Sequence, residues 1–191
     1  MDDSRHEQIV AVLADIGRDM FIAGLVGSHS GNMSVCRDGR VVITRRGARL
    51  GRLASDDLIE FDLHDEEVPD EASSESSVHL AVYEVSGHLA VVHGHPANAI
   101  AASLIDEGPE FVPQTLEASH HMPRVPVIDA PAGKAVEAMS GEIAQMIAEH
   151  SVVIARGHGT YSAGASLENA FQWTSVLEDA CKVAIALSWA R

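Results

Sequence analysis

Cysteines, positive charges and long apolar runs are all scarce in this chain of 191 residues. Its two cysteines, Cys36 and Cys181, exclude both a disulfide framework and a zinc site built from thiolates. No apolar run is long enough to cross a bilayer, and the polar, acidic start at 1–6 predicts neither a signal peptide nor a transit peptide. We therefore expect a cytoplasmic protein that does not insert into a membrane.

Positive charge is outweighed two to one, because 13 lysines and arginines face 28 aspartates and glutamates, which gives a formal net charge of −15. Such a chain repels phosphate backbones and anionic lipid surfaces, so we expect no nucleic-acid partner and no membrane partner. A local cluster can still attract an anionic substrate. The densest positive patch contains Arg45, Arg46, Arg49 and Arg52.

Histidine, by contrast, is abundant at 11 residues, so a metal site in this chain would consist of imidazoles and carboxylates. The apolar run 89–92 leads into His93 and His95, whose spacing places both rings on one face of an extended strand. A second apolar run, 151–155, opens into His158, which is flanked by glycines. Three imidazoles with an open position form the catalytic type of zinc site. The alternative is that all three are hydrogen-bonded core histidines.

A predicted helix start carries a second set of polar groups, Ser73, Ser74 and Glu75. The free N–H groups and the positive dipole end of a helix N-terminus suit an anion, and two serine hydroxyls beside them favour a phosphate. Glu75 would then be the general base, and the alternative is a plain helix cap. We interpret His79, one turn later on the same face, as a core residue or a residue behind the site. Further donors could come from Gly31, Asn32 and 44–47.

The apolar periodicity predicts helices interleaved with short strands in one domain, 1–191. Predicted helices cover 4–23, 73–86, 96–107, 134–149 and a last helix capped by Ser166. Predicted strands cover 33–37, 40–44, 59–63, 89–93, 125–128 and 151–155, and the first two form a hairpin at Asp38-Gly39. We expect 108–124 to be irregular and 156–160 to be a polar loop. The fold class is therefore α/β, with one mixed sheet and helices packed on its faces.

Five motifs together resemble the class II aldolase/adducin family, in that family's order and roughly its spacing. They are Ser-Gly-Asn-x-Ser at 30–34, Ile-Thr-x-x-Gly at 43–47, Ser-Ser-Glu at 73–75 followed by His79, His-x-His at 93–95 and Gly-His-Gly at 157–159. The resemblance spans about residues 5–190. It implies a three-layer α/β/α domain with a central mixed, largely antiparallel sheet, and a homotetramer whose active sites lie at subunit interfaces.

The resemblance also implies roles for particular residues. It implies one Zn2+ per chain, or Mn2+, Fe2+ or Co2+ in its place, bound by His93, His95 and His158. It implies that Glu75 is the catalytic acid and base, and that a phosphate pocket is formed by Gly31, Asn32, Thr44, Gly47, Ser73 and Ser74. The implied reaction is a lyase reaction, in which a phosphorylated ketose is cleaved to dihydroxyacetone phosphate and an aldehyde through a zinc-stabilised enediolate.

Two alternatives to an aldolase stay open. The family also contains sugar-phosphate epimerases, a methylthioribulose-phosphate dehydratase and sugar-acid-phosphate decarboxylases, which use the same scaffold. It further contains adducin heads, which are non-catalytic oligomeric binding modules. Epimerases typically carry Asp where this chain has Glu75, and adducin heads lack the metal histidines. Both comparisons favour an aldolase.

The chain departs from the family pattern in two places. The family often has Thr-Pro-Thr/Ser-Gly where this chain has Thr-Arg-Arg-Gly at 44–47, so positive charge comes near the implied phosphate. Family aldolases use tyrosines as proton donors, whereas the only tyrosines here are Tyr83 and Tyr161. We expect the proton donor to come instead from Glu117, His120 or His121, across a subunit interface.

Overall fold

The structure is a computed structural model that describes residues 3–129 and 136–190. Its centre is an eight-stranded sheet with the strand order β3-β2-β1-β4-β8-β7-β6-β5. Of its pairings only β6 with β7 is parallel, so the sheet is mixed and largely antiparallel, as expected. The strands are β1 (Asn32–Arg37), β2 (Arg40–Thr44), β3 (Leu58–Asp62), β4 (Ala90–Gly94), β5 (Glu110–Phe111), β6 (Val125–Ile128), β7 (Val152–Ala155) and β8 (Gly159–Gly164).

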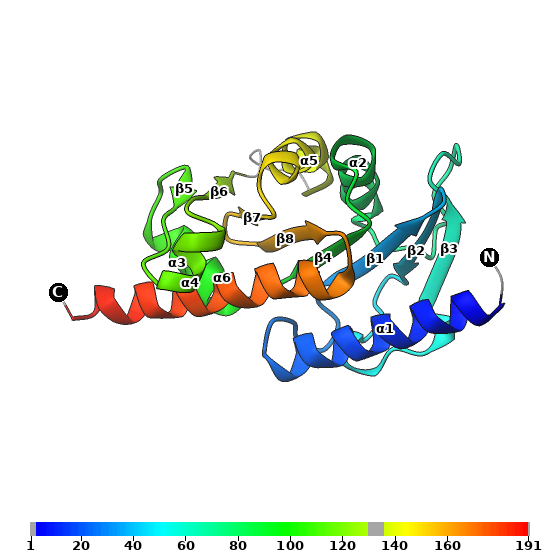
Figure 1. The fold of residues 1–191 in the computed structure, drawn as a ribbon, viewed down its shortest axis with the longest axis horizontal. Coiled ribbons are helices and arrows are strands. Elements are labelled where there is room, and N and C mark those ends of the chain that lie inside the picture. The colour runs from blue at the N-terminus through cyan, green and yellow to red at the C-terminus, as the bar shows by residue number, and fades with distance from the viewer. Residues whose placement is uncertain (1–2, 130–135, 191) are drawn as a thin grey trace.

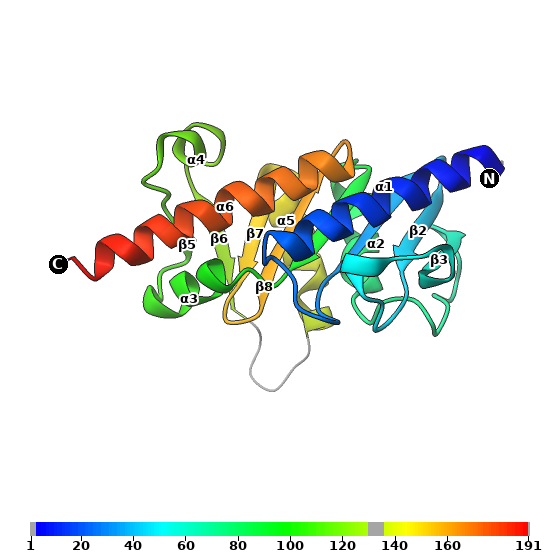
Figure 2. The same ribbon diagram turned by 90° about the horizontal axis from the view of Figure 1, so that it is seen from below.

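Helices cover both faces of the sheet and complete the three layers. Figure 1 shows α2 and α5 on one face and the long helices α1 and α6 on the other, and Figure 2 shows α1 and α6 from their own side. The α-helices are α1 (Asp3–Ile22), α2 (Ser76–Ser86), α3 (Ala97–Ile105), α4 (Leu116–His121), α5 (Ser140–Glu149) and α6 (Leu167–Ser188). Short 3-10 turns lie at Leu50–Arg52, Ser55–Asp57 and Val136–Met139. None of the α-helices in the described ranges is long and apolar enough to span a bilayer.

The alternation of side chains along the strands divides the core between the two faces. Val41 and Val91 pack in the cluster beneath α2 and α5, whereas Val42 and Val92 pack in the cluster beneath α1. A third cluster joins α3, α4 and α6 to β6 and β7. Because the strand period is two, His93 lies on the same face as Val91, toward α2. The alternation therefore aims the His93 ring at the N-terminus of that helix.

The hairpin turn and two of the helix ends form at the residues that the sequence predicts. Asp38 and Gly39 both have positive φ, as the hairpin between β1 and β2 requires. Gly87 is left-handed and ends α2. Ser166 accepts a hydrogen bond from the backbone N–H of Asn169 and caps α6. These predictions succeed because each depends on a few neighbouring residues.

The predicted polar loop at 156–160 is wrong in its second half. Gly159 and Thr160 begin β8, which lies in the middle of the sheet and pairs with β4 on one side and β7 on the other. The strand has a glycine at each end and no apolar run, so its sequence carries no strand signal. Its pairing partners on both sides stabilise it instead, through contacts that are distant in sequence.

Three smaller predictions also need correction. The segment 108–124, expected to be irregular, contains β5 and the short helix α4, whose buried Ala118 packs in the third cluster. The helix expected at 134–149 begins as an α-helix only at Ser140, and residues 134–135 lie outside the described ranges. Neither Ser73 nor Ser74 caps α2, because Glu75 occupies the N-cap position.

Candidate active site

The three histidines meet where β4 and the β7–β8 connection lie side by side. His93 is the fourth residue of β4, His95 follows the strand end, and His158 lies just before β8. Their ligand nitrogens all lie within 4.8 Å of one another, and Nε2 of His93 is 2.9 Å from Nε2 of His95. The His93 and His158 rings are stacked at 5.0 Å. The structure therefore brings together the three residues that the sequence selected.

A hydrogen bond to the backbone fixes the tautomer of His93. Its Nδ1 lies 2.9 Å from the backbone oxygen of Thr160, an acceptor, so Nδ1 carries the proton and donates it. The lone pair is thereby left on Nε2, which faces the other two rings. Burial holds the pKa of His93 at about 3 and lowers the pKa of His95. Both rings are therefore neutral at pH 7, which is the form that binds a metal ion.

Glu75, at the start of α2, faces the histidines. Its Oε2 lies 3.3 Å from Nε2 of His93, and its Oε1 lies 3.3 Å from Nε2 of His158. Two donors reach Oε2, the side-chain amide of Asn32 at 3.1 Å and the hydroxyl of Tyr161 at 3.0 Å. The carboxylate is thus shared between the histidine cluster and a pair of hydrogen-bond donors.

These contacts keep Glu75 ionised. Burial alone would raise the pKa of its carboxyl group, but the contact with His158, the interaction with His93 and the hydrogen bonds from Asn32 and Tyr161 outweigh burial. The pKa is therefore well below its usual range. An ionised carboxylate beside three imidazoles can accept a proton or contribute a fourth ligand to a cation.

Glycine at 159 allows the strands to come this close. A Cβ on Gly159 would lie 2.3 Å from the backbone oxygen of Gly94, and within 3.1 Å of the His93 and His95 rings. Such a contact with the backbone cannot be relieved by rotating a side chain. Gly159, which follows His158 in the sequence, therefore allows β8 to pack closely against β4 at the histidine cluster.

The segments expected to bind a phosphate surround the N-terminus of α2. Arg45 pairs with Ala72 in an isolated bridge, and the N–H of Arg46 donates to the oxygen of Glu71 at 2.8 Å. The turn that contains Gly47 is thereby held against Ser73, which is buried beside the exposed Ser74. Gly31 lies next to Asn32, one of the donors to Glu75.

Two of these residues are already engaged in the protein's own hydrogen bonds. The hydroxyl of Thr44 accepts from the N–H of Met33 at 3.2 Å, and the amide of Asn32 contacts both Glu75 and His79. Both side chains are buried. They support this wall of the site from inside the protein, while residues 45–47 and Ser74 are exposed at its surface.

A sequence model of the family described as Class II Aldolase and Adducin N-terminal domain matches residues 11–185. The chain belongs to the class II aldolase and adducin family. A methylthioribulose-1-phosphate dehydratase from Acidiphilium cryptum is 32% identical over 189 residues, which cover 92% of this chain and 87% of that protein. An L-fuculose phosphate aldolase from Methanococcus vannielii is 31% identical over 163 residues, which cover 83% of this chain and 85% of that protein.

The fold agrees with this assignment. The crystal structure of an L-fuculose-1-phosphate aldolase from Thermus thermophilus superimposes with a TM-score of 0.89 at 31% identity, and the match covers 96% of this chain and 95% of that one. This chain is therefore a member of the class II aldolase superfamily, in which relatives are named both as aldolases and as dehydratases.

Class II aldolases are metal dependent, and the residues of this chain fit a metal ion. Nε2 of His158 is buried and has no hydrogen-bond partner among the described residues, although Oε1 of Glu75 lies 3.3 Å away. An unsatisfied buried ring nitrogen is costly unless a cation accepts its lone pair. With His93 and His95 it provides three imidazole donors and a nearby carboxylate, a ligand set that suits zinc and other first-row metals.

The residues expected to donate a proton lie apart from the three histidines. Glu117, His120 and His121 are on α4, and all three are exposed. The described ring contacts of the two histidines are with each other and with Trp173 of α6. Within one chain, no described hydrogen bond, ion pair or ring contact joins α4 to the histidine cluster.

Tyr161 is the site residue that the sequence analysis missed. The sequence pattern gives this tyrosine no role and predicts no strand at 161. In the structure it pairs with His93 across β4 and β8, stacks on the His93 ring at 4.2 Å and donates to Glu75. Its position three residues after His158 is a usable signal only once β8 is known to be a strand.

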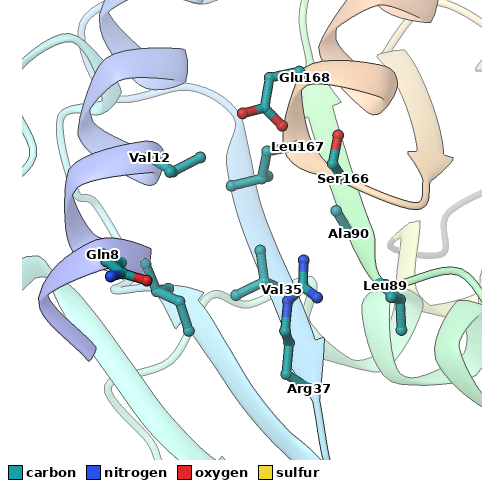
Figure 3. Close-up of a pocket in the computed structure, with 10 residues that line it drawn as sticks. Gln8, Val12, Val35, Arg37, Leu89, Ala90, Ser166, Leu167 and Glu168 are labelled. Atoms are coloured by element: carbon teal, nitrogen blue, oxygen red, sulfur yellow. The ribbon is translucent and has the colours of Figure 1, made fainter. Parts of the chain in front are cut away.

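A cavity among the described residues lies away from the histidines. It has a volume of about 290 Å³ and lies between α1, the start of β4 and the start of α6. Figure 3 shows Val12, Ala90 and Leu167 around it, with Arg37 and Glu168 at its edges. Ala90 packs in the cluster beneath α1, on the opposite face of the sheet from His93. This cavity is therefore separate from the candidate active site.

Proposed function

We propose that this protein is a metal-dependent aldolase that cleaves a phosphorylated ketose to dihydroxyacetone phosphate and an aldehyde. The observation that carries the proposal is the position of Glu75 at the start of α2, where its carboxylate faces the three clustered histidines. The zinc ion or related metal held by His93, His95 and His158 would, when bound, polarise the substrate carbonyl and stabilise the negative charge that develops on its oxygen.

One wall of the candidate site is complementary in charge to the phosphate of the substrate. The N-terminus of α2 offers a positive dipole end, and the turn at 44–47 adds two arginines to an otherwise acidic chain. We propose that the phosphate binds against Gly31, Asn32, Thr44, Gly47, Ser73 and Ser74. Because Glu75 is the N-cap residue of α2, a phosphate bound there would put the ketose carbon chain beside the carboxylate.

Glu75 would handle the proton at the carbon next to the carbonyl. Glu75 is ionised in the substrate-free site, so in the cleavage direction it first takes up a proton from solvent. When the C3–C4 bond of the ketose breaks, the electron pair stays on C3, and the protonated Glu75 delivers its proton to that carbon to give dihydroxyacetone phosphate. In the reverse direction Glu75 removes the same proton. Proton transfer by a positioned side chain typically contributes about 10²- to 10⁴-fold in rate.

The hydroxyl on C4 must lose its proton as it becomes the aldehyde. Because α4 is exposed and does not contact the histidines of its own chain, we propose that Glu117, His120 or His121 of a neighbouring subunit accepts that proton. This requires a homo-oligomer, for which we propose the tetramer. Exposed apolar side chains on α3, α4, α6 and the adjoining residues support an interface, among them Leu104, Val112, Leu116, Leu187 and Trp189.

A second candidate function has a specific observation in its favour. The dehydratase from Acidiphilium cryptum is as similar to this chain as the L-fuculose phosphate aldolases are. A dehydratase would use Glu75 at the same carbon, but the proton would be removed and the hydroxyl on the next carbon would leave as water. The two reactions therefore differ in which bond to C4 breaks.

A product assay separates the two functions. The purified protein, with its metal content measured, is incubated with L-fuculose 1-phosphate and with methylthioribulose 1-phosphate. We expect dihydroxyacetone phosphate from the first, detected by a coupled dehydrogenase, and about one metal ion per chain. Loss of water from the second without aldol cleavage of the first would favour the dehydratase. A chain that binds no metal would overturn both.

The variant Glu75→Gln tests whether Glu75 is the catalytic base. The substitution keeps the shape of the side chain and removes the proton acceptor, so we expect turnover to fall by about 10²-fold or more while metal remains bound. His150→Ala removes a histidine outside the cluster and should leave turnover and metal unchanged. Full turnover in the Glu75→Gln variant would show that the assignment of the base is wrong.

A further inference from the structure

Behind Glu75, buried polar residues form one continuous hydrogen-bond chain. Oδ1 of Asn32 lies 2.6 Å from Nε2 of His79, and Nδ1 of His79 lies 2.6 Å from Oγ of Ser34. Ser34 in turn lies 2.5 Å from the hydroxyl of Tyr83. All four residues are buried, and they join β1 to α2. The proposed function uses Asn32 and Glu75 but gives no role to the residues behind them.

Each hydrogen bond in this chain has only one possible direction. An ionised Glu75 only accepts, so the NH₂ group of Asn32 must face it, and the Asn32 oxygen must face His79. Nε2 of His79 therefore donates. Burial holds the pKa of His79 at about 4, so the ring is neutral and its Nδ1 accepts from the hydroxyl of Ser34. Ser34 then accepts from Tyr83. Every donor points toward Glu75.

This ordering affects the two oxygens of Glu75 differently. Oε2 accepts from both Asn32 and Tyr161, which lowers its basicity and fixes the plane of the carboxylate. Oε1 lies beside His158, on the side of the histidine cluster. The arrangement leaves Oε1 as the oxygen that exchanges a proton with substrate. Donors arranged in one direction also polarise one another, which strengthens each bond.

We propose that His79 is a positioning residue, whose Nε2–H holds the Asn32 amide in the one orientation that presents its N–H to Glu75 and so aims Oε1 of the carboxylate at the substrate. This inference rests on the proposed role of Glu75 as the base. If the N–H of His79 is lost, the Asn32 amide can rotate and turn its oxygen toward the carboxylate. The resulting repulsion would move Glu75 without removing any group that touches substrate.

The alternative is that His79 only fills a polar space in the core. Two substitutions distinguish these roles. In His79→Gln the side-chain amide reaches the position of Nε2 and can donate to Asn32. In His79→Asn the amide reaches only the position of Nδ1, so it can accept from Ser34 but leaves Asn32 without a donor. A space-filling role predicts similar losses for both variants, whereas positioning predicts a large difference.

The kinetic experiment measures kcat, KM, metal content and thermal unfolding of both variants. We expect His79→Asn to lose roughly tenfold to a hundredfold in kcat, with KM within about threefold of the wild type and metal retained, because small misplacements of a reacting group have effects of this size. His79→Gln should recover kcat to within about fivefold of wild type. Equal kcat values for the two variants would overturn the proposal.

Thr174→Val provides the matched control for lost stability. Thr174 is buried, and its hydroxyl bonds to Ser162 on the face of the sheet away from His79. The substitution removes one buried hydrogen bond and should lower the unfolding temperature without changing kcat. If kcat falls with unfolding temperature in all variants alike, general destabilisation explains the losses and the proposal is wrong.

A spectroscopic measurement tests His79 even if the protein acts on a different substrate. Histidines labelled with ¹⁵N are recorded at pH 7, and the His79 ring is assigned by comparison with His79→Gln. We expect a neutral ring with its proton on Nε2 in the wild type, and in a Tyr83→Phe variant as well. A proton on Nδ1 would overturn the proposed chain. The expected tautomer with no lyase activity would instead count against the proposed function.

Discussion

At the scale of single residues, the candidate site depends on which atoms carry protons. Nδ1 of His93 donates to a backbone oxygen, which leaves the lone pair of Nε2 facing the other two histidines. Asn32 and Tyr161 both donate to Oε2 of Glu75. None of these choices could be deduced from residue type alone, since a neutral histidine has two tautomers and a carboxylate has two oxygens. The neighbours decide them, because each buried acceptor requires a donor.

Tyr161→Phe tests the second donor to Glu75. The variant keeps the ring that stacks on His93 and removes only the hydroxyl, so we expect metal to stay bound and kcat to fall by about tenfold. Tyr83→Phe is the matched variant, because it removes a buried hydroxyl that lies four hydrogen bonds from the carboxylate, and its loss in kcat should be smaller. Wild-type kcat in the Tyr161→Phe variant would show that this hydroxyl does not position Glu75.

At the scale of elements, the site is built where β4, β8 and the start of α2 meet. The strands were predicted from apolar runs, which identified β4 and β7 but not β8. The small and polar residues of β8 can be central because β4 and β7 satisfy its backbone on both sides. At Gly159 there is no room for a Cβ between β8 and the end of β4, so this residue couples sheet packing to the histidines.

Gly159→Ala tests this coupling. Because the new Cβ would lie 2.3 Å from the oxygen of Gly94, β8 must shift away from β4. We expect a loss of stability of about 1–3 kcal/mol, as for overpacking, together with weakened metal binding. The measurements are urea denaturation and metal titration.

Gly141→Ala is the control for that substitution. Nothing lies within 4 Å of a Cβ at Gly141, which belongs to α5. Alanine is favoured over glycine in a helix by about 0.5–1 kcal/mol, so this variant should be slightly more stable and bind metal as the wild type does. If Gly159→Ala behaved in the same way, the close packing of β8 on β4 would not matter for the metal site.

At the scale of the whole molecule, buried neutral histidines make the stability depend on pH. His79 has a pKa of about 4 in the folded protein and about 6.5 when unfolded, so between these values the unfolded chain binds more protons. The free energy of unfolding should therefore fall as pH drops from about 6.5 toward 4, by up to about 1.4 kcal/mol per pH unit for this residue.

Urea denaturation of the metal-free protein across that pH range provides the test. His79→Gln cannot titrate at this position, so its stability should fall less steeply with decreasing pH than that of the wild type. Identical pH slopes for the two proteins would mean that His79 is not held neutral by burial. Measuring at several ionic strengths separates this local effect from repulsion between surface charges.

Oligomerisation belongs to the same scale, because the proposed site is incomplete within one chain. We predict that Glu75→Gln and a triple variant of Glu117, His120 and His121 to Ala are each inactive. When the two proteins are mixed, unfolded and refolded together, some sites combine an intact Glu75 with an intact α4 from the neighbour. Activity should then return. Hetero-oligomers that form without recovering activity would show that α4 does not act across the interface.

The sequence by itself determined the local features of this protein and selected the three histidines that the structure brings together. The His93–His95 spacing, the glycines around His158, the hairpin at Asp38-Gly39 and the end of α2 at Gly87 all follow from a few neighbouring residues. Only the tertiary structure decided that β8 is a central strand, that Tyr161 contacts Glu75 and that His79 stands behind Asn32. These features depend on contacts between residues distant in the chain, which packing and hydrogen-bond satisfaction select and local pattern does not encode.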